Sequence, residues 1–224
     1  MTRYPAILNL GFRLFFFTAS AFAALTMLAW LLLYQNHQLT VGGLVAQWWH
    51  GHEMIYGYAA AVVTGFLFTA VQNWTGVPMP HGWPLFFYWL PWFIARLLFA
   101  FAPSLHLVAA GFDLLFALGG LYAVATRVVA VKQWRQMGLV SKMGLLASGQ
   151  ILFISGLLGF AHGIRWSLYL GVFTILAIVL TIGRRVTPFF TERGVGCPFT
   201  PKNSALLDRA CLITFTAFFI LKVF

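Results

Sequence analysis

Apolar runs of about 20 residues recur along the chain, and most of its basic residues lie in the short breaks between them. A helical run of this length spans the hydrocarbon core of a bilayer. No long alternation of apolar and polar residues appears, so helices rather than a barrel should satisfy the backbone in lipid. Only 8% of the 224 residues are charged, against roughly 25% in soluble domains. The sequence therefore predicts an all-α, polytopic transmembrane helical bundle.

Six membrane spans are clear in the sequence, and a seventh is partial. We expect them in a single integral membrane domain over residues 1–224, at 14–33, 49–71, 84–101, 105–125, 143–161, 166–186 and 206–224. Arg3 and Arg13 precede the first run, which is longer than the roughly 7 to 15 residue core of a signal peptide. We expect this run to remain as a transmembrane helix.

The net charge of +10 is explained by topology. Basic residues gather in the breaks after the fourth and sixth runs, at Arg127, Lys132, Arg135 and Lys142 and at Arg184, Arg185, Arg193, Lys202 and Arg209. Short loops rich in Lys and Arg stay in the cytoplasm. We therefore expect a cytoplasmic N-terminus, contact with membrane lipid, and no nucleic acid partner.

This orientation places four histidines at span ends in the outer leaflet, namely His50, His52, His106 and His162. Two of them belong to the stretch from Trp48 to Met54, which combines two imidazoles, a carboxylate and a thioether. Ionisable groups within membrane spans are costly and usually functional. A metal or haem site is one hypothesis, and histidines that only cap helices and hydrogen-bond at the interface are the other.

Helical phase separates the two neighbouring histidines. At 100° per residue, His50, Glu53 and Met54 share one face, and His52 points away from it. His50 and His52 can then bind one metal only if the first helical turn is broken, and otherwise they belong to two sites. We expect His50, His52 and Met54 as candidate metal ligands, with Glu53 orienting a ligand histidine through its second ring nitrogen.

His162 closes the fifth span above a stripe of small and polar residues that includes Gly159. Histidine is a usual axial ligand of haem, and Gly159 would leave room for a ring edge. We expect His162 to share one outer-leaflet cofactor site with His50, and His106 to lie outside that site. An interfacial histidine without a ligand is the alternative.

Arg96 and Asp113 lie at similar depth in the third and fourth spans, which a short loop joins. The two helices should be antiparallel neighbours, so the two charges should form a structural ion pair. The alternative is that Arg96 binds the cofactor by holding a haem propionate.

Several motifs together resemble one family: Gly11–Phe16, Trp49–Met54, Gly65–Leu67, Asn73–Gly76, Gly82–Leu85 and Arg184–Thr191. At these residues the chain resembles the NnrS family, bacterial membrane proteins described as containing haem and copper and linked to nitric oxide metabolism and stress. The resemblance implies a multi-pass protein of the bacterial inner membrane that holds haem, copper or both near the periplasmic leaflet. It also implies contact with nitric oxide or a metal-nitrosyl species.

Members of that family usually have about a dozen spans, so the chain is expected to correspond to the N-terminal half, with a second copy as a partner that could complete the bundle. Two other function classes stay open. One is a small-solute transporter or structural membrane subunit without cofactor, and the other is a b-type cytochrome electron-transfer subunit. Whether the protein is an enzyme is left open by the sequence.

Overall fold

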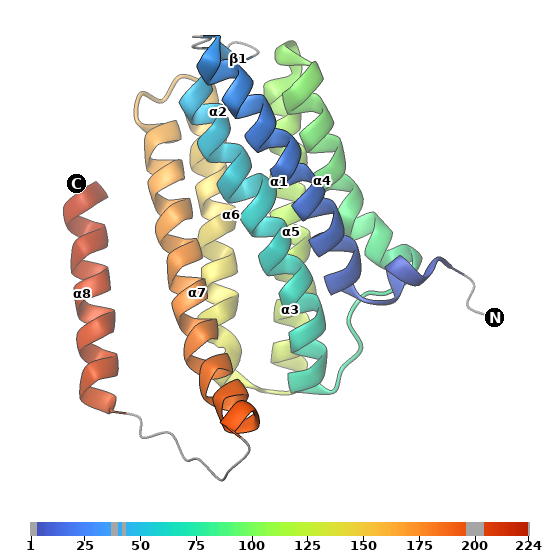
Figure 1. The fold of residues 1–224 in the computed structure, drawn as a ribbon, viewed down its shortest axis with the longest axis vertical. Helices are drawn as coiled ribbons and strands as arrows, with labels where there is room; N and C mark the ends of the chain where they lie inside the picture. The colour runs from blue at the N-terminus through green and yellow to red at the C-terminus, as the bar shows by residue number, and fades with distance from the viewer. Residues whose placement is uncertain (1–3, 37–39, 42–43, 196–203, 224) are drawn as a thin grey trace. The chain divides into compact units, whose positions relative to one another are not determined.

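The computed structural model describes residues 4–36, 40–41, 44–195 and 204–223. Within them the chain is almost entirely helical (Figure 1). The helices are α1 (Gly11–Gln35), α2 (Ala46–His52), the π-helix η2 (Glu53–Ala59), α3 (Ala60–Thr75), α4 (Trp83–Phe101), α5 (His106–Ala130), α6 (Met137–Leu157), α7 (Gly163–Val195) and α8 (Ala205–Val223). Short 3-10 turns are η1 (Ala6–Asn9), η3 (Pro103–Leu105) and η4 (Trp134–Gln136), and β1 (Thr40–Val41) pairs antiparallel with β2 (Leu44–Val45).

Among the described residues, six helical segments are long and apolar enough to cross a membrane: 11–35, 46–75, 83–101, 103–130, 134–157 and 163–195. The all-α, multi-span fold predicted from hydropathy is thereby confirmed. The helices extend beyond most of the expected spans, by three residues at the start of α1 and by nine at the end of α7. Hydropathy marks the part of a helix that lies in lipid, whereas the helix itself continues until a cap or turn ends it.

Two compact units divide the chain, residues 1–175 and 176–224. The second unit consists of the later part of α7 and of α8. In the first unit, α4 packs against α5, α5 packs against α6, and α3 packs against both α1 and α5. We call the end of this unit that carries β1, β2, η3 and the connection 158–162 the histidine end. The segment 76–82 and η4 lie at the opposite end (Figure 1).

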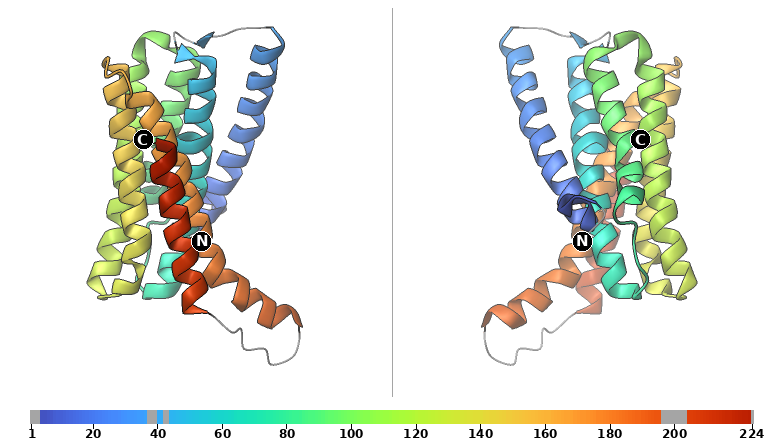
Figure 2. Two further views of the ribbon diagram at one scale, coloured as in Figure 1. Left: turned by 90° about the vertical axis from the view of Figure 1, so that its left-hand side faces the viewer. Right: turned by 90° about the vertical axis from the view of Figure 1, so that its right-hand side faces the viewer.

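Small residues let α1 approach α3 closely near the start of α1. A Cβ added to Gly65 would lie 2.5 Å from the Cβ of Phe15, and one added to Gly11 would lie 2.6 Å from the Cβ of Phe68. Small residues serve this purpose in membrane helices, where the van der Waals contact of backbones drives association. From this contact α1 diverges from its neighbours toward the histidine end (Figure 2).

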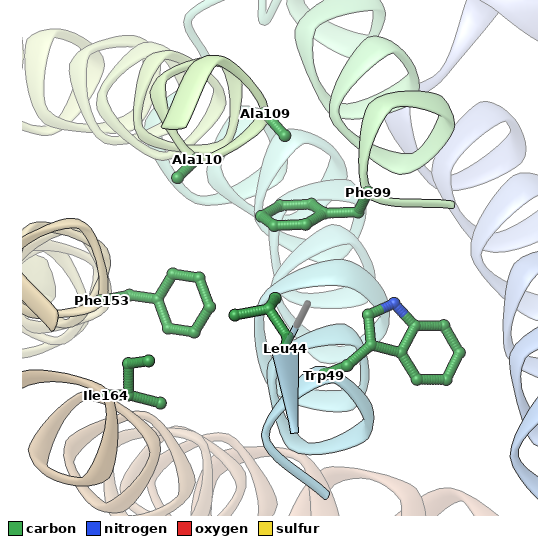
Figure 3. Packing of buried hydrophobic residues seen from close by; sticks show 7 residues of the cluster. All are labelled: Leu44, Trp49, Phe99, Ala109, Ala110, Phe153 and Ile164. Atoms are coloured by element: carbon green, nitrogen blue, oxygen red, sulfur yellow. The ribbon is translucent and has the colours of Figure 1, made fainter. Parts of the chain in front are cut away.

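A hydrophobic cluster at the histidine end collects side chains from six elements (Figure 3). Its buried members are Leu44, Trp49, Phe99, Ala109, Ala110, Phe153 and Ile164. Phe99 and Phe153 also contact the ring of His52, at centroid distances of 4.7 and 4.1 Å. The cluster therefore shields the polar residues next to it from water.

Candidate functional site: a buried ionic network and its flanking histidines

Arg96 of α4 lies between two buried carboxylates. Its Nη1 donates to Glu53 Oε2 of η2 at 2.5 Å, and its Nη2 donates to Asp113 Oδ2 of α5. The three residues are between 0% and 5% exposed. Arg96 and Asp113 thus contact each other as their positions on neighbouring helices suggest, but Glu53 is a third member that the sequence did not assign to this pair.

His52 joins the same network and is 1% exposed. Its Nδ1 lies 3.1 Å from Glu53 Oε1, and its Nε2 lies 3.4 Å from Gln150 Oε1 of α6 and 3.6 Å from Asp113 Oδ2. Both ring nitrogens therefore face protein acceptors. Gln150 was not singled out in the sequence, although a glutamine in the middle of an apolar run is a signal that could have found it.

Helical phase placed His52 on the opposite face from Glu53, but both side chains are buried. The expectation that His52 points away from the interior assumed that only one face of this segment is buried, but Tyr56 and Gly57 of the π-helix η2 are buried as well. His52 is instead turned inward beside Glu53. Glu53 has His52 and Arg96 as hydrogen-bond partners, whereas the ring of His50 stacks on Trp30 of α1.

Gly57 within the π-helix makes room for the network. A Cβ at this position would lie 2.5 Å from Arg96 Nη1 and 2.8 Å from a ring carbon of Phe22. Its carbonyl oxygen accepts a hydrogen bond from Trp92 Nε1 at 2.7 Å. A glycine is therefore required for Arg96 to reach Glu53, and α4 provides a donor for the irregular backbone of η2.

Tyr56 links the π-helix to the first part of α7. Its hydroxyl donates to the carbonyl oxygen of Ser167 at 2.7 Å and accepts from the Ser167 hydroxyl at 3.1 Å. Gly149 of α6 lies against this hydroxyl, and an added Cβ would approach it to 2.1 Å. The position of η2 is thus fixed by side chains of α4 and α7 and by the close approach of α6.

His50 and His106 flank the network at the histidine end, and each has one buried ring nitrogen with no hydrogen-bond partner in the described part of the chain. The ring of His50 stacks on Trp30 of α1 at a centroid distance of 4.5 Å and leaves Nδ1 without a partner. The ring of His106 stacks on Phe99 at 5.6 Å and leaves Nε2 without a partner. His106 was expected to lie outside the site, because height in the membrane and helical phase do not indicate a ring nitrogen without a partner.

The other predicted site residues lie apart from the network. His162 is exposed in the connection between α6 and α7, with its ring stacked on Trp166 at 5.5 Å, and Met54 is half-buried in η2. The structure places His50, His106 and His162 at one end of the bundle, but no hydrogen bond or ring contact joins them to one another. Within the described ranges, no three His, Cys, Asp or Glu side chains form a group that could hold a metal ion.

An apolar cavity of about 720 Å³ lies between α1 and α4. Trp49 and Arg96 are among its lining residues, and no histidine lines it. An imidazole therefore does not reach the cavity wall, and a haem placed there would lack a histidine ligand from this lining.

Comparison with known proteins identifies the family. The family model described as "NnrS protein" matches residues 6–224 of the chain. A search of curated proteins and a search of solved structures each found no significant match. The match covers nearly the whole chain, including both flanking histidines and every member of the ionic network, and the chain therefore belongs to the NnrS family.

Proposed function

We propose that this protein holds haem, copper or both at the histidine end of its bundle, near the periplasmic leaflet, and that it acts in the response to nitric oxide. The observation that carries the proposal is the pair of buried ring nitrogens, His50 Nδ1 and His106 Nε2, that lack a partner in the described structure. Leaving a buried polar atom unpaired costs about 1 to 3 kcal/mol. A bound metal centre would offset that cost.

His50 and His106 fit the role of a ligand to haem iron or copper better than His52 does. A neutral imidazole nitrogen is a common ligand of haem iron and of copper, and each of the two rings is already oriented by an aromatic neighbour, Trp30 or Phe99. His52 has protein partners at both nitrogens, so it would have to release Gln150 before it could bind a metal. We assign His52 and Glu53 to the network that positions α2 and η2.

Met54 and His162 complete the candidate donor set. A thioether is a soft ligand that suits Cu(I), and the exposed ring of His162 is accessible to a ligand from outside the bundle. Because the described residues form no three-ligand group, remaining coordination positions would be filled by the cofactor itself, by nitric oxide or by a second copy of the chain. A bound haem or copper would supply the open coordination position at which nitric oxide binds.

The orientation of the protein is part of the same proposal. We infer a cytoplasmic N-terminus and a bacterial inner-membrane location, because the basic break at 131–136 lies at the end of the first unit opposite the histidine end. The flanking histidines then lie near the periplasmic leaflet, where nitric oxide enters from outside.

An absorption spectrum and a metal analysis of the detergent-purified protein test the proposal. We expect a Soret band or bound copper, and a spectral shift when a nitric oxide donor is added without oxygen. His50→Ala and His106→Ala should each lower the bound haem or copper per chain. His162→Ala should lower it as well if His162 shares the site.

The matched control is His81→Ala at the opposite end of the bundle, where Nδ1 already faces the carbonyl oxygen of Met79 at 3.1 Å. This variant should keep wild-type cofactor content. Full occupancy in the His50 and His106 variants, with the fold intact by circular dichroism, would refute the site. A wild-type protein that binds neither haem nor copper after both are supplied would refute the proposed function itself.

A further inference from the structure

The turn between α5 and α6, residues 131–136, lies at the end of the first unit opposite the histidine end (Figure 1). We call it the basic turn, because it carries Lys132 and Arg135. Trp134 within it is 62% exposed, and Trp83, which begins α4 at the same end, is 53% exposed. Tryptophan is enriched at the headgroup level of membranes. We therefore place the basic turn at that level.

The positive charge near the basic turn is not balanced within the first unit. Residues 1–175 contain two acidic residues, Glu53 and Asp113, and both are buried in the ionic network. Arg127 lies in the last turn of α5, and the acceptors of its hydrogen bonds are neutral carbonyl and hydroxyl oxygens. A counter-ion for this end of the unit must therefore come from outside it.

Lys132 occupies a backbone position that favours glycine. The end of α5 is a Schellman motif: the Gln133 N–H donates to the Val128 carbonyl oxygen at 3.1 Å, and the Lys132 N–H donates to that of Val129 at 3.0 Å. The φ of Lys132 is +54°, and no other non-glycine among the described residues has a positive φ. Glycine adopts this conformation without strain. Strained residues cluster at functional sites, including ligand clamps, so the side chain of Lys132 is the feature to explain.

Two hydrogen bonds hold the basic turn against the chain that leaves α3. Gln133 Nε2 donates to the Trp74 carbonyl oxygen at 2.6 Å, and Arg127 Nε donates to that of Pro78 at 3.4 Å. Lys132 itself is exposed. Its ammonium group is thus presented on a fixed backbone, which lowers the entropic cost of binding a ligand.

The face of α5 that leads to the basic turn is exposed and apolar. Leu115, Leu118, Tyr122 and Val129 are between 45% and 64% exposed, and at 100° per residue they lie within about 60° of one another around the helix. An acyl chain that lies along this face brings its headgroup to the level of Lys132. A free phosphate ion gains nothing from the same face.

From these observations we propose that the basic turn binds the headgroup of an anionic glycerophospholipid. Lys132 contacts the lipid phosphate, the charges of Arg127 and Arg135 add to the attraction, and the acyl chains pack along α5. Basic groups beside the ends of membrane helices attract anionic headgroups in this way. The proposal does not depend on haem or copper, because the flanking histidines lie at the opposite end of the first unit.

The test is native mass spectrometry of the full chain in detergent, titrated with phosphatidylglycerol or with phosphatidylcholine of the same acyl chains. The wild-type protein should bind phosphatidylglycerol more tightly. Glycerol 1-phosphate, which has the charge but no acyl chain, should displace that lipid only at much higher concentration. Equal affinity for the two lipids would overturn the proposal, and displacement by glycerol 1-phosphate at the concentration of the lipid itself would overturn the assignment of a lipid.

Variants of Lys132 locate the site. Lys132→Gln should weaken the binding of phosphatidylglycerol about fivefold, which corresponds to the contribution of one basic residue near an anionic surface, and Lys132→Arg should retain it. Arg165→Gln is the matched control, because it removes one exposed positive charge at the histidine end. An equal loss in Arg165→Gln would show a response to net charge alone and would refute the site.

Lys132→Gly separates binding from stability. It removes the same charge as Lys132→Gln but relieves the strain at φ +54°, so the melting temperature in phosphatidylcholine nanodiscs should be unchanged or higher while the affinity for phosphatidylglycerol falls about fivefold. Wild-type affinity in both the Gln and the Gly variant would refute the proposal. A lower melting temperature in both, with the lipid preference unchanged, would instead assign Lys132 to the dipole of α5 and overturn the lipid site.

Discussion

Replacing Arg96 by methionine should destabilise the protein more than any other single change in the ionic network. Methionine retains an unbranched chain of similar length but removes the one guanidinium that lies between Glu53 and Asp113. Both carboxylates would stay buried, with His52 as their only other basic neighbour among the described residues. Removing one partner of a buried ion pair costs about 3 to 5 kcal/mol. Since this change leaves two carboxylates unpaired, we expect a loss of unfolding free energy in the upper part of that range.

The geometry also predicts the order in which the related variants lose stability. Asp113→Asn leaves Arg96 balanced by Glu53, so it should cost only about 1 to 3 kcal/mol, as for one altered buried hydrogen bond. If Arg96 and Asp113 formed an isolated pair, removing both charges would be milder than removing Asp113 alone. With Glu53 present, the double variant Arg96→Met with Asp113→Asn still leaves one unpaired carboxylate and should be worse than Asp113→Asn. Adding Glu53→Gln should recover part of the loss.

The free energy of unfolding, measured by SDS titration in mixed micelles with tryptophan fluorescence, tests this order. Arg165→Met is the control: Arg165 is exposed, its guanidinium stacks over Tyr169 at 5.7 Å, and surface changes usually stay within about 0.5 kcal/mol. If Arg96→Met lowers the free energy of unfolding no more than Arg165→Met does, the buried ionic network does not stabilise the protein. If the Arg96/Asp113 double variant is more stable than Asp113→Asn, the role of Glu53 as a shared partner is refuted.

Two further predictions concern packing and orientation. Gly149→Ala should cost about 1 to 3 kcal/mol of unfolding free energy as an overpacked core site, because the new Cβ meets the Tyr56 hydroxyl. The control is Gly144→Ala on the same helix, whose Cβ meets nothing within 4 Å and which should be neutral or stabilising. Equal losses of stability in the same SDS titration would contradict the overpacking at Gly149. A phosphatase fusion at Gln133 should be inactive and one at Ser104 active, because short basic loops resist translocation; the reverse pattern would refute the proposed topology.

The sequence was sufficient for the number and approximate limits of the membrane helices, since hydropathy over about 20 residues reports burial in lipid directly. It also brought Arg96 and Asp113 to the same depth, because the short connection around η3 leaves neighbouring helices little freedom. The partners of these two residues were harder to foresee. Glu53 lies 43 residues from Arg96 in the chain, and no local pattern states which distant helix faces which.

The inward position of His52 could not be obtained from helical phase, because this segment is buried on more than one face. Gly57 and Gly65 are both glycines of the second span, and Gly65 serves helix packing against Phe15. At Gly57 the space is occupied instead by Arg96 and Phe22. The same small side chain therefore serves two purposes within two turns of one another, and only the fold distinguishes them.

The π-helix gives the histidine end an unusual dependence on residue number. Each i→i+5 turn contains one residue more than the α-helical turn it replaces, so η2 acts as a one-residue insertion between α2 and α3. Deleting the exposed Tyr58 would let the segment return to regular α-helix and would rotate α2 by about 100° relative to α3. His52 and Glu53 would then turn away from Asp113 and Arg96, and His50 would leave Trp30. The number of residues in this short segment, more than the identity of any one side chain in it, therefore decides which imidazole faces the interior.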